Sequence, residues 1–165
     1  MFYRYHDSPI GRLLLSGDTC GLQQVLMDID DKPWLIVEQW RSAGDELDEV
    51  CRQLDEYFAG RRQRFELALA PQGTAFQHAV WQALLQIPFG QTSSYSALAA
   101  EIERPKAVRA VGAANGANPI AIIIPCHRVI GRDGSLTGYA GGLTRKALLL
   151  KLEGAQLPEQ KLLGF

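Results

Sequence analysis

Residues 119–131, with the sequence PIAIIIPCHRVIG, are the stretch from which the organisation of this chain is best predicted. Ile120 to Ile124 form an apolar run between two prolines, which predicts a short buried β-like segment. Pro125 fixes the backbone where this run ends, so Cys126 follows at its edge with a restricted approach. We therefore expect an apolar segment that leads into a loop and presents one thiol there.

The chemistry of this loop depends on how the Cys126 thiol is activated. A thiolate is the reactive species, and at neutral pH it forms beside a cation or a base. His127 and Arg128 are adjacent in sequence, but adjacency alone does not bring their side-chain heads to the sulfur. By itself this segment leaves a structural cysteine and a reactive one both open.

The other two cysteines lie in ordinary structural positions. Cys20 falls in a predicted turn, and Cys51 lies on the apolar face of a predicted helix. Three widely spaced cysteines fit free thiols in a reducing cytoplasm and argue against a disulfide framework. The cysteines and histidines show no ligand spacing, so we predict no metal. We expect no secretion signal and no membrane span, because no apolar run is long enough.

The pattern on both sides of the cysteine loop is mostly helical. Thr74 can cap a first helix, and short helices are predicted at 94–102 and 106–115. The turn Glu103-Arg104-Pro105 joins these two short helices into a helix–turn–helix. A last helix is predicted at 144–153.

The second helix of this pair carries almost only small side chains, namely Ala107, Ala110, Gly112, Ala113, Ala114 and Gly116. A glycine inside a helix costs roughly 1 kcal/mol relative to alanine, which close approach to another surface would offset. That surface is either a packed helix or the DNA minor groove, which is about 6 Å wide. Arg109 is the one long cation within this helix that could enter a groove, and Arg104 and Lys106 are placed for phosphates.

The first seventy residues predict a separate lobe without visible chemistry. Turn clusters separate short apolar runs in residues 1–31, which is typical of a small antiparallel sheet. A helical stripe runs from Asp45, a candidate N-cap, to Phe58, and Gly60 ends it. Residues 64–70 alternate enough for a further strand.

The predicted fold class is therefore α+β. An N-terminal α/β lobe at 1–72, a small antiparallel sheet with a helix, precedes a mostly helical C-terminal domain at 73–165 that contains the helix–turn–helix and the cysteine loop. Hydrophobic residues make up 47% of the chain and charged residues 21%, which indicates a packed core rather than disorder.

Charge is distributed unevenly although the net charge is only −1. Residues 1–70 hold eight Lys/Arg against thirteen Asp/Glu, and residues 71–165 hold nine against five. Within 104–151 the only acidic residue is Asp133, whereas the basic residues are Arg104, Lys106, Arg109, Arg128, Arg132, Arg145, Lys146 and Lys151. This bias predicts either a face for a polyanion or an ordinary solvated basic surface.

Residues 74–153 resemble the catalytic region of the O6-alkylguanine-DNA alkyltransferases, also called methylated-DNA–protein-cysteine methyltransferases. The matching residues are Phe89-Gly90, Ser94-Tyr95, the Ala-Val-Arg-Ala-Val-Gly of 107–112, Asn118-Pro119, the Ile-Pro-Cys-His-Arg-Val of 124–129, Gly138-Tyr139, Gly141-Gly142 and Leu152-Glu153-Gly154. Pro-Cys-His-Arg-Val is a fairly specific signature, and the Arg-bearing helix before it and the Glu after it stand in the family's order. The first seventy residues resemble, more loosely, the N-terminal lobe of the stand-alone form.

The resemblance implies a single-turnover transfer of the alkyl group from the O6 of guanine in DNA to Cys126, without a cofactor. It implies that His127 acts through a water as the base of Cys126, and that Glu153 holds and polarises His127. Asn118 would brace the active-site loop. Tyr95 would crowd the 3′ phosphate and help protonate the departing guanine.

The resemblance also implies that the helix–turn–helix binds the minor groove of double-stranded alkylated DNA, with Arg109 entering the duplex in place of an extruded nucleotide. The other residues expected to face DNA are Ser94, Tyr95, Arg104, Lys106, Gly112, Asn115 and Arg128. Those expected around the flipped base are Ala121, Val129, Tyr139, Ala140 and Gly141. Ala121 is small, which predicts a pocket that takes alkyl groups larger than methyl. We expect a monomer, and cooperative binding on DNA and repair of O4-alkylthymine stay open.

Three other functions fit part of the pattern. A non-catalytic module that marks alkyl lesions would keep the base-flipping residues but needs no Cys126. A cysteine hydrolase would use Cys126 and His127 but needs an oxyanion hole, and it leaves the small-residue helix unexplained. A helix–turn–helix regulator would usually dimerise and bind the major groove.

Overall fold

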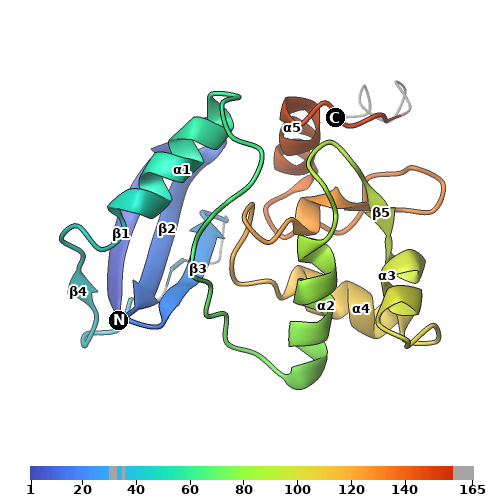
Figure 1. The fold of residues 1–165 in the computed structure, drawn as a ribbon, viewed down its shortest axis with the longest axis horizontal. Coiled ribbons are helices and arrows are strands. Elements are labelled where there is room, and N and C mark those ends of the chain that lie inside the picture. The colour runs from blue at the N-terminus through green and yellow to red at the C-terminus, as the bar shows by residue number, and fades with distance from the viewer. Residues whose placement is uncertain (30–32, 35, 158–165) are drawn as a thin grey trace. The chain divides into compact units, whose positions relative to one another are not determined.

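The computed structural model describes residues 1–29, 33–34 and 36–157. Contacts between Cα atoms divide the chain into two compact units, Met1–Gln72 with Pro119–Ala121, and Gly73–Asn118 with Ile122–Phe165. Within the described residues, the first unit carries a β-sheet and one α-helix, and the second carries four α-helices and one 3₁₀ turn (Figure 1). The predicted α+β class is confirmed.

The sheet of the first unit consists of β1 (Phe2–Ser8), β2 (Gly11–Asp18), β3 (Gly21–Met27) and β4 (Arg41–Ser42), in the spatial order β3-β2-β1-β4. The three long strands pair antiparallel, as predicted. The two-residue β4 pairs parallel to β1, so the sheet is mixed rather than purely antiparallel. Residues 13–15 of β2 are all fully buried. Successive side chains of a strand point to opposite faces of the sheet, so both faces of the sheet are covered by other residues at β2.

The helix of the first unit, α1, spans Asp48–Phe58 and lies across the sheet (Figure 1). It begins later than predicted, and no side chain caps it. Asp45, the predicted cap, accepts the N–H of Asp48 through its backbone carbonyl at 3.1 Å. Gly60 ends the helix as predicted, because its φ of 75° lies in the left-handed region that glycine adopts readily. Cys51 lies on the buried face, as expected of a structural cysteine.

The strand predicted at 64–70 is wrong. This segment forms only an isolated bridge between Leu69 and Leu22, with hydrogen bonds from Leu22 N to Ala68 O and from Ala70 N to Leu22 O. The alternating hydrophobic residues therefore belong to a segment that pairs with β3 at one residue and does not form a continuous strand.

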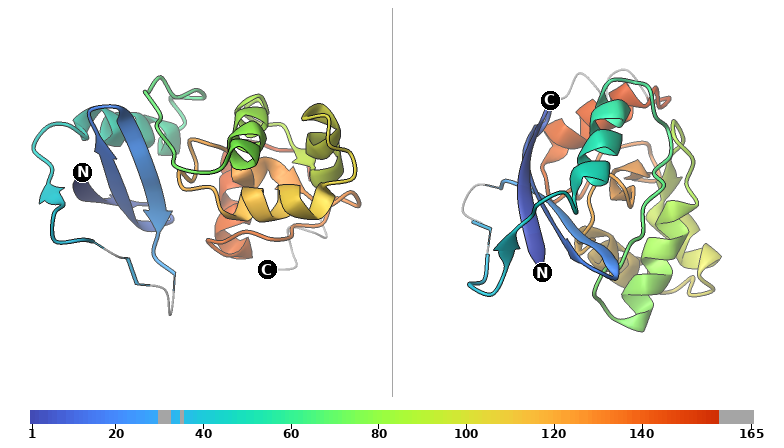
Figure 2. Two further views of the ribbon diagram at one scale, coloured as in Figure 1. Left: turned by 90° about the horizontal axis from the view of Figure 1, so that it is seen from below. Right: turned by 60° about the vertical axis from the view of Figure 1, so that its left-hand side comes forward.

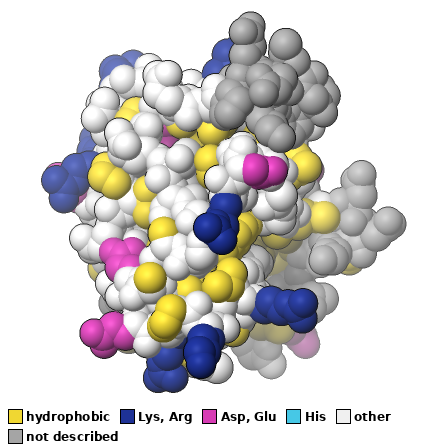
Figure 3. All heavy atoms as spheres, turned by 90° about the vertical axis from the view of Figure 1, so that its right-hand side faces the viewer, with side chains coloured by type: hydrophobic (Ala, Val, Ile, Leu, Met, Phe, Trp, Pro, Cys, Tyr) yellow, Lys and Arg dark blue, Asp and Glu magenta, His cyan; other side chains and the backbone are white. Residues whose placement is uncertain are grey.

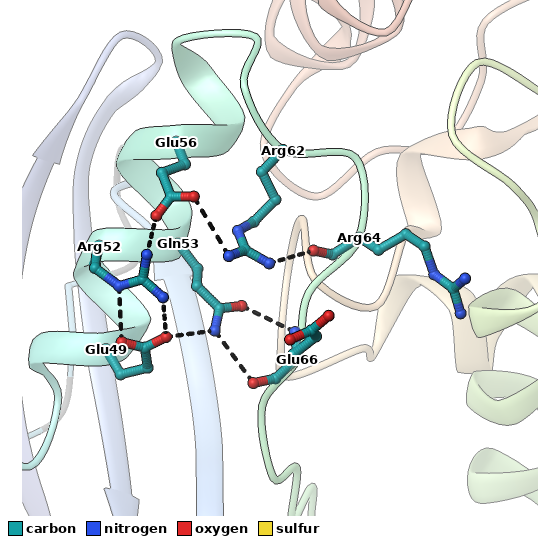
Figure 4. Close-up of polar contacts among 7 residues, drawn as sticks. All are labelled: Glu49, Arg52, Gln53, Glu56, Arg62, Arg64 and Glu66. Carbon is teal, nitrogen blue, oxygen red and sulfur yellow. Dashed lines mark hydrogen bonds and ion pairs between the residues drawn. The ribbon is translucent and has the colours of Figure 1, made fainter.

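The side chain of Gln53 in α1 holds the same segment (Figure 4). Its amide nitrogen donates to Glu66 O at 3.1 Å, and its Oε1 accepts from Glu66 N at 2.9 Å. Arg62 adds a hydrogen bond to Arg64 O at 2.9 Å and an ion pair with Glu56 at 3.3 Å. Gln53 is almost fully buried, so its amide satisfies backbone groups that a strand partner would otherwise satisfy.

The segment Pro119–Ala121 also belongs to the first unit. Val25 N donates to Pro119 O at 2.9 Å, and Ala121 N donates to Val25 O at 3.0 Å, so Ile120 forms a bridge with Val25. The β-like run predicted over 120–124 therefore reduces to one bridging residue. Ile122 has a φ of 73°, a conformation that costs a β-branched residue roughly 1–2 kcal/mol.

The helices of the second unit are α2 (Ala75–Leu85), α3 (Tyr95–Glu101), α4 (Val108–Gly116) and α5 (Leu143–Leu152). Thr74 caps α2 as predicted, in a reciprocal capping box with Gln77. Helices α2, α3 and α4 pack against one another (Figure 2). The buried indole N–H of Trp81 donates to Ala114 O at 2.9 Å and so joins α2 to α4.

A short parallel pair, β5 (Ser93–Ser94) with β6 (Val129–Ile130), joins the entry of α3 to the chain that follows the cysteine. This pairing was not predicted, because two-residue strands leave no periodicity in the sequence. In the described part of the chain, no helix combines the length and the apolar character needed to cross a membrane.

Candidate active site

Cys126 is the first residue of a one-turn 3₁₀ helix, Cys126–Arg128, rather than part of an open loop. Its Sγ-bearing side chain is buried, with a relative exposure of 7% for the residue. The strained turn at Ile122 and the fixed backbone of Pro125 precede it directly. The turn therefore delivers a thiol that is enclosed by protein instead of one at an exposed edge.

A hydrogen bond joins His127 to Glu153. Nε2 of His127 lies 2.8 Å from Oε2 of Glu153, and neither side chain is exposed. Burial opposes ionisation of Glu153, but hydrogen bonds from His127 and Arg128 outweigh it and lower its pKa to about 2. Glu153 is therefore a carboxylate at neutral pH.

The charge state of this pair fixes the tautomer of His127. Burial lowers the pKa of His127, although Glu153 opposes that shift, so the imidazole is neutral at neutral pH. A carboxylate only accepts hydrogen bonds, so Nε2 of His127 carries the proton and donates a hydrogen bond to Glu153. Nδ1 is then a bare acceptor. This atom is buried and has no hydrogen-bond partner among the described residues.

Arg128 joins the His127–Glu153 pair through its guanidinium. Its Nε and Nη2 donate to the two oxygens of Glu153 at 2.8 and 3.0 Å, and its Nη1 donates to Ile87 O at 2.6 Å. The side chain is buried. The guanidinium of Arg128 is therefore engaged by Glu153 and Ile87 in this structure, and its contact with DNA stays a prediction.

Asn118 and Lys146 influence the ionisation of Cys126, and Cys126 influences that of Tyr139. Burial raises the pKa of the Cys126 thiol, while a hydrogen bond with Asn118 and the charge of Lys146 lower it. Asn118 also donates from Nδ2 to Ile124 O at 2.8 Å, which ties the turn before the cysteine. Burial and the nearby Cys126 raise the pKa of Tyr139 well above its ordinary value, so its phenol stays protonated. The resting thiol is also protonated, and its reaction needs a base.

The segment 137–139 is held by hydrogen bonds from Tyr95 and Lys146 to Thr137 O. Tyr95, the first residue of α3, donates from its hydroxyl to Thr137 O at 3.3 Å. Gly138 has a φ of 57°, and a Cβ there would lie 3.2 Å from the Tyr95 hydroxyl. The structure thus places Tyr95 beside the segment that leads into Tyr139.

Lys146 was expected on a basic surface and is instead fully buried. Its Nζ donates to Val129 O at 2.5 Å and to Thr137 O at 2.6 Å. Helical spacing in α5 contained the signal, because Lys146 shares the buried stripe of Leu149, Leu150 and Glu153. With Arg128 also buried, the basic bias of the sequence overstates the positive charge available at the surface.

The small residues of α4 divide between two faces. Val111 and Ala114 are buried, whereas Ala110, Ala113 and Gly116 are exposed. Packing accounts for small side chains on the buried face only. No heavy atom lies within 4 Å of a Cβ built at Gly116. Packing within the molecule therefore does not explain why the exposed face carries only small side chains.

Cations flank this exposed face. Arg104, Lys106 and Arg109 are all exposed, as a DNA-facing set requires. Figure 3 shows basic side chains among hydrophobic, neutral and acidic ones on one face of the molecule. Asn115 does not belong to this set, because it is buried at 2% exposure. Its expected DNA contact stays a prediction, which this burial does not favour.

The remaining predicted residues have mixed surroundings. Gly112 is half-buried, and a Cβ there would lie 3.8 Å from the Tyr95 ring, an ordinary contact distance. The Ser94 hydroxyl caps α3 by accepting from Ala97 N at 3.1 Å. Val129 is fully buried in β6. Ala121 and Gly141 are half-buried and Ala140 is exposed.

Among the residues that the structure describes, no group of His, Cys, Asp and Glu side chains could hold a metal ion.

The second unit thus holds a buried cysteine next in sequence to a histidine that is paired with a carboxylate, and a helix–turn–helix with an exposed face of small residues. Two family models match this chain. The 6-O-methylguanine DNA methyltransferase DNA binding domain matches residues 75–155, and the ribonuclease-like domain of the same family matches residues 1–71. The chain therefore belongs to the 6-O-methylguanine DNA methyltransferase family.

Curated and solved relatives agree with this assignment. The methylated-DNA–protein-cysteine methyltransferase of Methanosarcina acetivorans is 51% identical over 155 residues, which cover 94% of this chain and 99% of that protein. The protein of the same name from Mycobacterium tuberculosis is 47% identical over 156 residues, or 94% of each. The crystal structure of Mycobacterium tuberculosis OGT in complex with DNA matches with a TM-score of 0.87 at 46% identity and covers 99% of both chains.

Proposed function

We propose that this protein repairs alkylated DNA by transferring the alkyl group from the O6 of guanine to its own Cys126. The observation that carries the proposal is the geometry around the thiol: neutral His127, fixed by Glu153, keeps a bare and buried Nδ1 next in sequence to the cysteine. The names of the relatives and the family support the same reaction.

The reaction is a displacement at a saturated carbon. His127 Nδ1 takes the thiol proton, through a bridging water as in the family it belongs to, and Glu153 stabilises the imidazolium that results. The sulfur forms a bond to the alkyl carbon while the bond from that carbon to O6 breaks. The electron pair stays on guanine, which is then protonated; Tyr95 is the proposed donor.

Repair of a base in a duplex requires that the base leaves the stack, which costs a few kcal/mol. We assign the approach to α4, whose exposed Ala110, Ala113 and Gly116 fit a minor groove of about 6 Å. Arg109 is the wedge that fills the place of the extruded nucleotide. Arg104 and Lys106 contact phosphates, which position the protein without reading sequence.

The product determines the stoichiometry. A thioether carries no carbonyl that water could attack, so the thiol is not regenerated and each molecule acts once. A hydrolase acting through the same Cys126 would turn over, whereas a module that only marks lesions would form no bond at all.

Nucleoside analysis of repaired DNA tests the proposal. A duplex that contains one O6-methylguanine should lose that nucleoside and gain guanine after incubation with the protein. Cys126→Ala should leave the lesion intact, whereas Cys20→Ala, which changes an exposed cysteine, should repair as the wild type does. If Cys126→Ala removed the lesion, the proposal would be wrong.

A further inference from the structure

One buried cation has no part in the mechanism described so far. Lys146 is fully buried in α5, and its ammonium donates to the carbonyls of Val129 and Thr137. Burying a charge is costly unless it is well paired, and these two acceptors are neutral. A leucine or methionine would fill this position in an ordinary helix at lower cost, so the charge itself calls for an explanation.

Both acceptors lie between the cysteine turn and Tyr139 in sequence. Val129 follows the Cys126–Arg128 turn, and Thr137 precedes Gly138 and Tyr139. Thr137 O accepts from Lys146 and also from the Tyr95 hydroxyl, so it joins α5 to α3. Through this carbonyl, Lys146 fixes the segment that carries Tyr139 relative to the turn that carries the thiol.

The charge of Lys146 also acts on the sulfur. Burial lowers the pKa of Lys146 to about 8, and Cys126 opposes that shift; in the other direction Lys146 lowers the pKa of the Cys126 thiol. With a value of about 8, most Lys146 side chains are protonated at pH 7. The ammonium is therefore present when the thiolate forms.

The other charged or titratable groups near the thiol do not supply this positive charge. Tyr139 from the preceding segment stays neutral, and His127 is neutral before it accepts the proton. Arg128 and Glu153 neutralise each other. Asn118 contributes only a dipole. Arg145 lowers the pKa of Tyr139, whereas the charge that lowers the pKa of the Cys126 thiol is that of Lys146.

We propose that Lys146 is a positioning residue of the alkyl transfer, which ties Val129 and Thr137 together around the centre and stabilises the Cys126 thiolate through its fixed charge. This inference rests on the proposed function, but its test does not require DNA. It extends the machinery from the His127–Glu153 pair to α5.

Capture of the thiol by iodoacetamide measures the effect on the sulfur alone. The thiolate displaces iodide, so the sulfur–carbon bond forms as the carbon–iodine bond breaks, and the rate at each pH follows the thiolate fraction. The Cys126 peptide is quantified by mass spectrometry at pH 7, where Lys146 is mostly protonated. Lys146→Met and Lys146→Gln should slow capture about tenfold at this pH, which corresponds to a thiol pKa higher by about one unit.

The pair of neutral variants separates charge from tethering. Lys146→Gln can still donate to a carbonyl, whereas Lys146→Met cannot, yet both lack the charge. Lys146→Arg should restore the wild-type capture rate at pH 7, because it keeps the cation. An unchanged capture rate in a folded Lys146→Met or Lys146→Gln protein overturns the proposal.

A measurement on the wild type covers the case in which the variants do not fold. Coupling between two titrating groups is reciprocal, so alkylation of Cys126 removes the thiolate that stabilises the Lys146 ammonium. The pKa of Lys146, followed by NMR of its ¹³Cε, should be lower in the alkylated protein than in the free one. An unchanged value contradicts the proposal. If the wild type takes no methyl from DNA, the proposed function fails, whereas these thiol and lysine measurements still decide the role of Lys146.

Discussion

Glu153 Oε2 lies 2.8 Å from Nε2 of His127, and both side chains are completely buried. This contact determines which nitrogen of the imidazole remains available as a base. It also binds the C-terminal end of α5 to the turn that carries the thiol, because Glu153 is the residue that follows α5. The catalytic role of the histidine and the stability of the unit are therefore coupled in one contact.

The first prediction concerns the carboxylate. Glu153→Gln should slow methyl transfer about 100-fold or more, because a neutral amide no longer fixes the tautomer of His127 or stabilises its cation. The variant should also lose roughly 3 kcal/mol or more of unfolding free energy, since Arg128 keeps a buried charge without its partner. Single-turnover kinetics and urea unfolding measure the two effects. Glu38→Gln, an exposed change, should alter neither.

The second prediction concerns acid stability. Glu153 has a folded pKa of about 2 against an ordinary 4.5, so it binds fewer protons in the folded state. Its contribution, about 3 kcal/mol, is present above pH 4.5 and is lost as the pH falls toward 2. The lowered pKa of His127 has the same sign and begins to cost stability below pH 6.5. Unfolding free energy measured from pH 8 to 2 should therefore fall in both windows for the wild type.

Glu153→Gln provides the control for this pH dependence. Since the variant has no carboxyl at this position, the decline of its stability between pH 4.5 and 2 should be shallower than that of the wild type. Equal slopes for the two proteins would show that Glu153 ionises normally in the fold.

The third prediction separates extrusion of the base from its chemistry. Arg109→Ala should weaken methyl transfer from a duplex at least tenfold, because the wedge is lost. It should leave the reaction with free O6-benzylguanine unchanged, because a free base needs no extrusion. Lys151→Ala, which removes another exposed cation, is the control. Equal losses on both substrates would show that Arg109 supports the site itself and not the duplex.

The fourth prediction tests the exposed face of α4. Ala113→Leu should reduce affinity for duplex DNA at least tenfold, because a side chain of this size does not fit between the groove walls. Its unfolding free energy should stay within about 0.5 kcal/mol of the wild type, as expected for an exposed helix position. Ala79→Leu, at an exposed position of α2, should bind DNA normally. Unaltered binding by Ala113→Leu would exclude this face from the interface.

Some of this structure is predictable from sequence for a physical reason. Helical periodicity identified α1 to α5, and Thr74 and Gly60 marked helix ends because capping and left-handed φ are local properties. The hairpins of β1, β2 and β3 were predictable from their turns. Each of these features depends on residues a few positions apart.

Contacts between distant residues explain the failures. Arg128 and Lys146 were interpreted as surface cations, because neither Glu153 nor the Thr137 carbonyl can be recognised as a partner from the sequence alone. Residues 64–70 alternate like a strand but are held by the buried amide of Gln53. The tautomer of His127 likewise depends on the three-dimensional pairing with Glu153.

Intact-protein mass after incubation with excess O6-methylguanine duplex tests the central claim most directly. The account predicts the addition of one methyl group per protein, located on Cys126 by peptide mapping, with no further increase and no further repair once every molecule is modified. A protein of unchanged mass, or one that repairs more lesions than there are protein molecules, would contradict it.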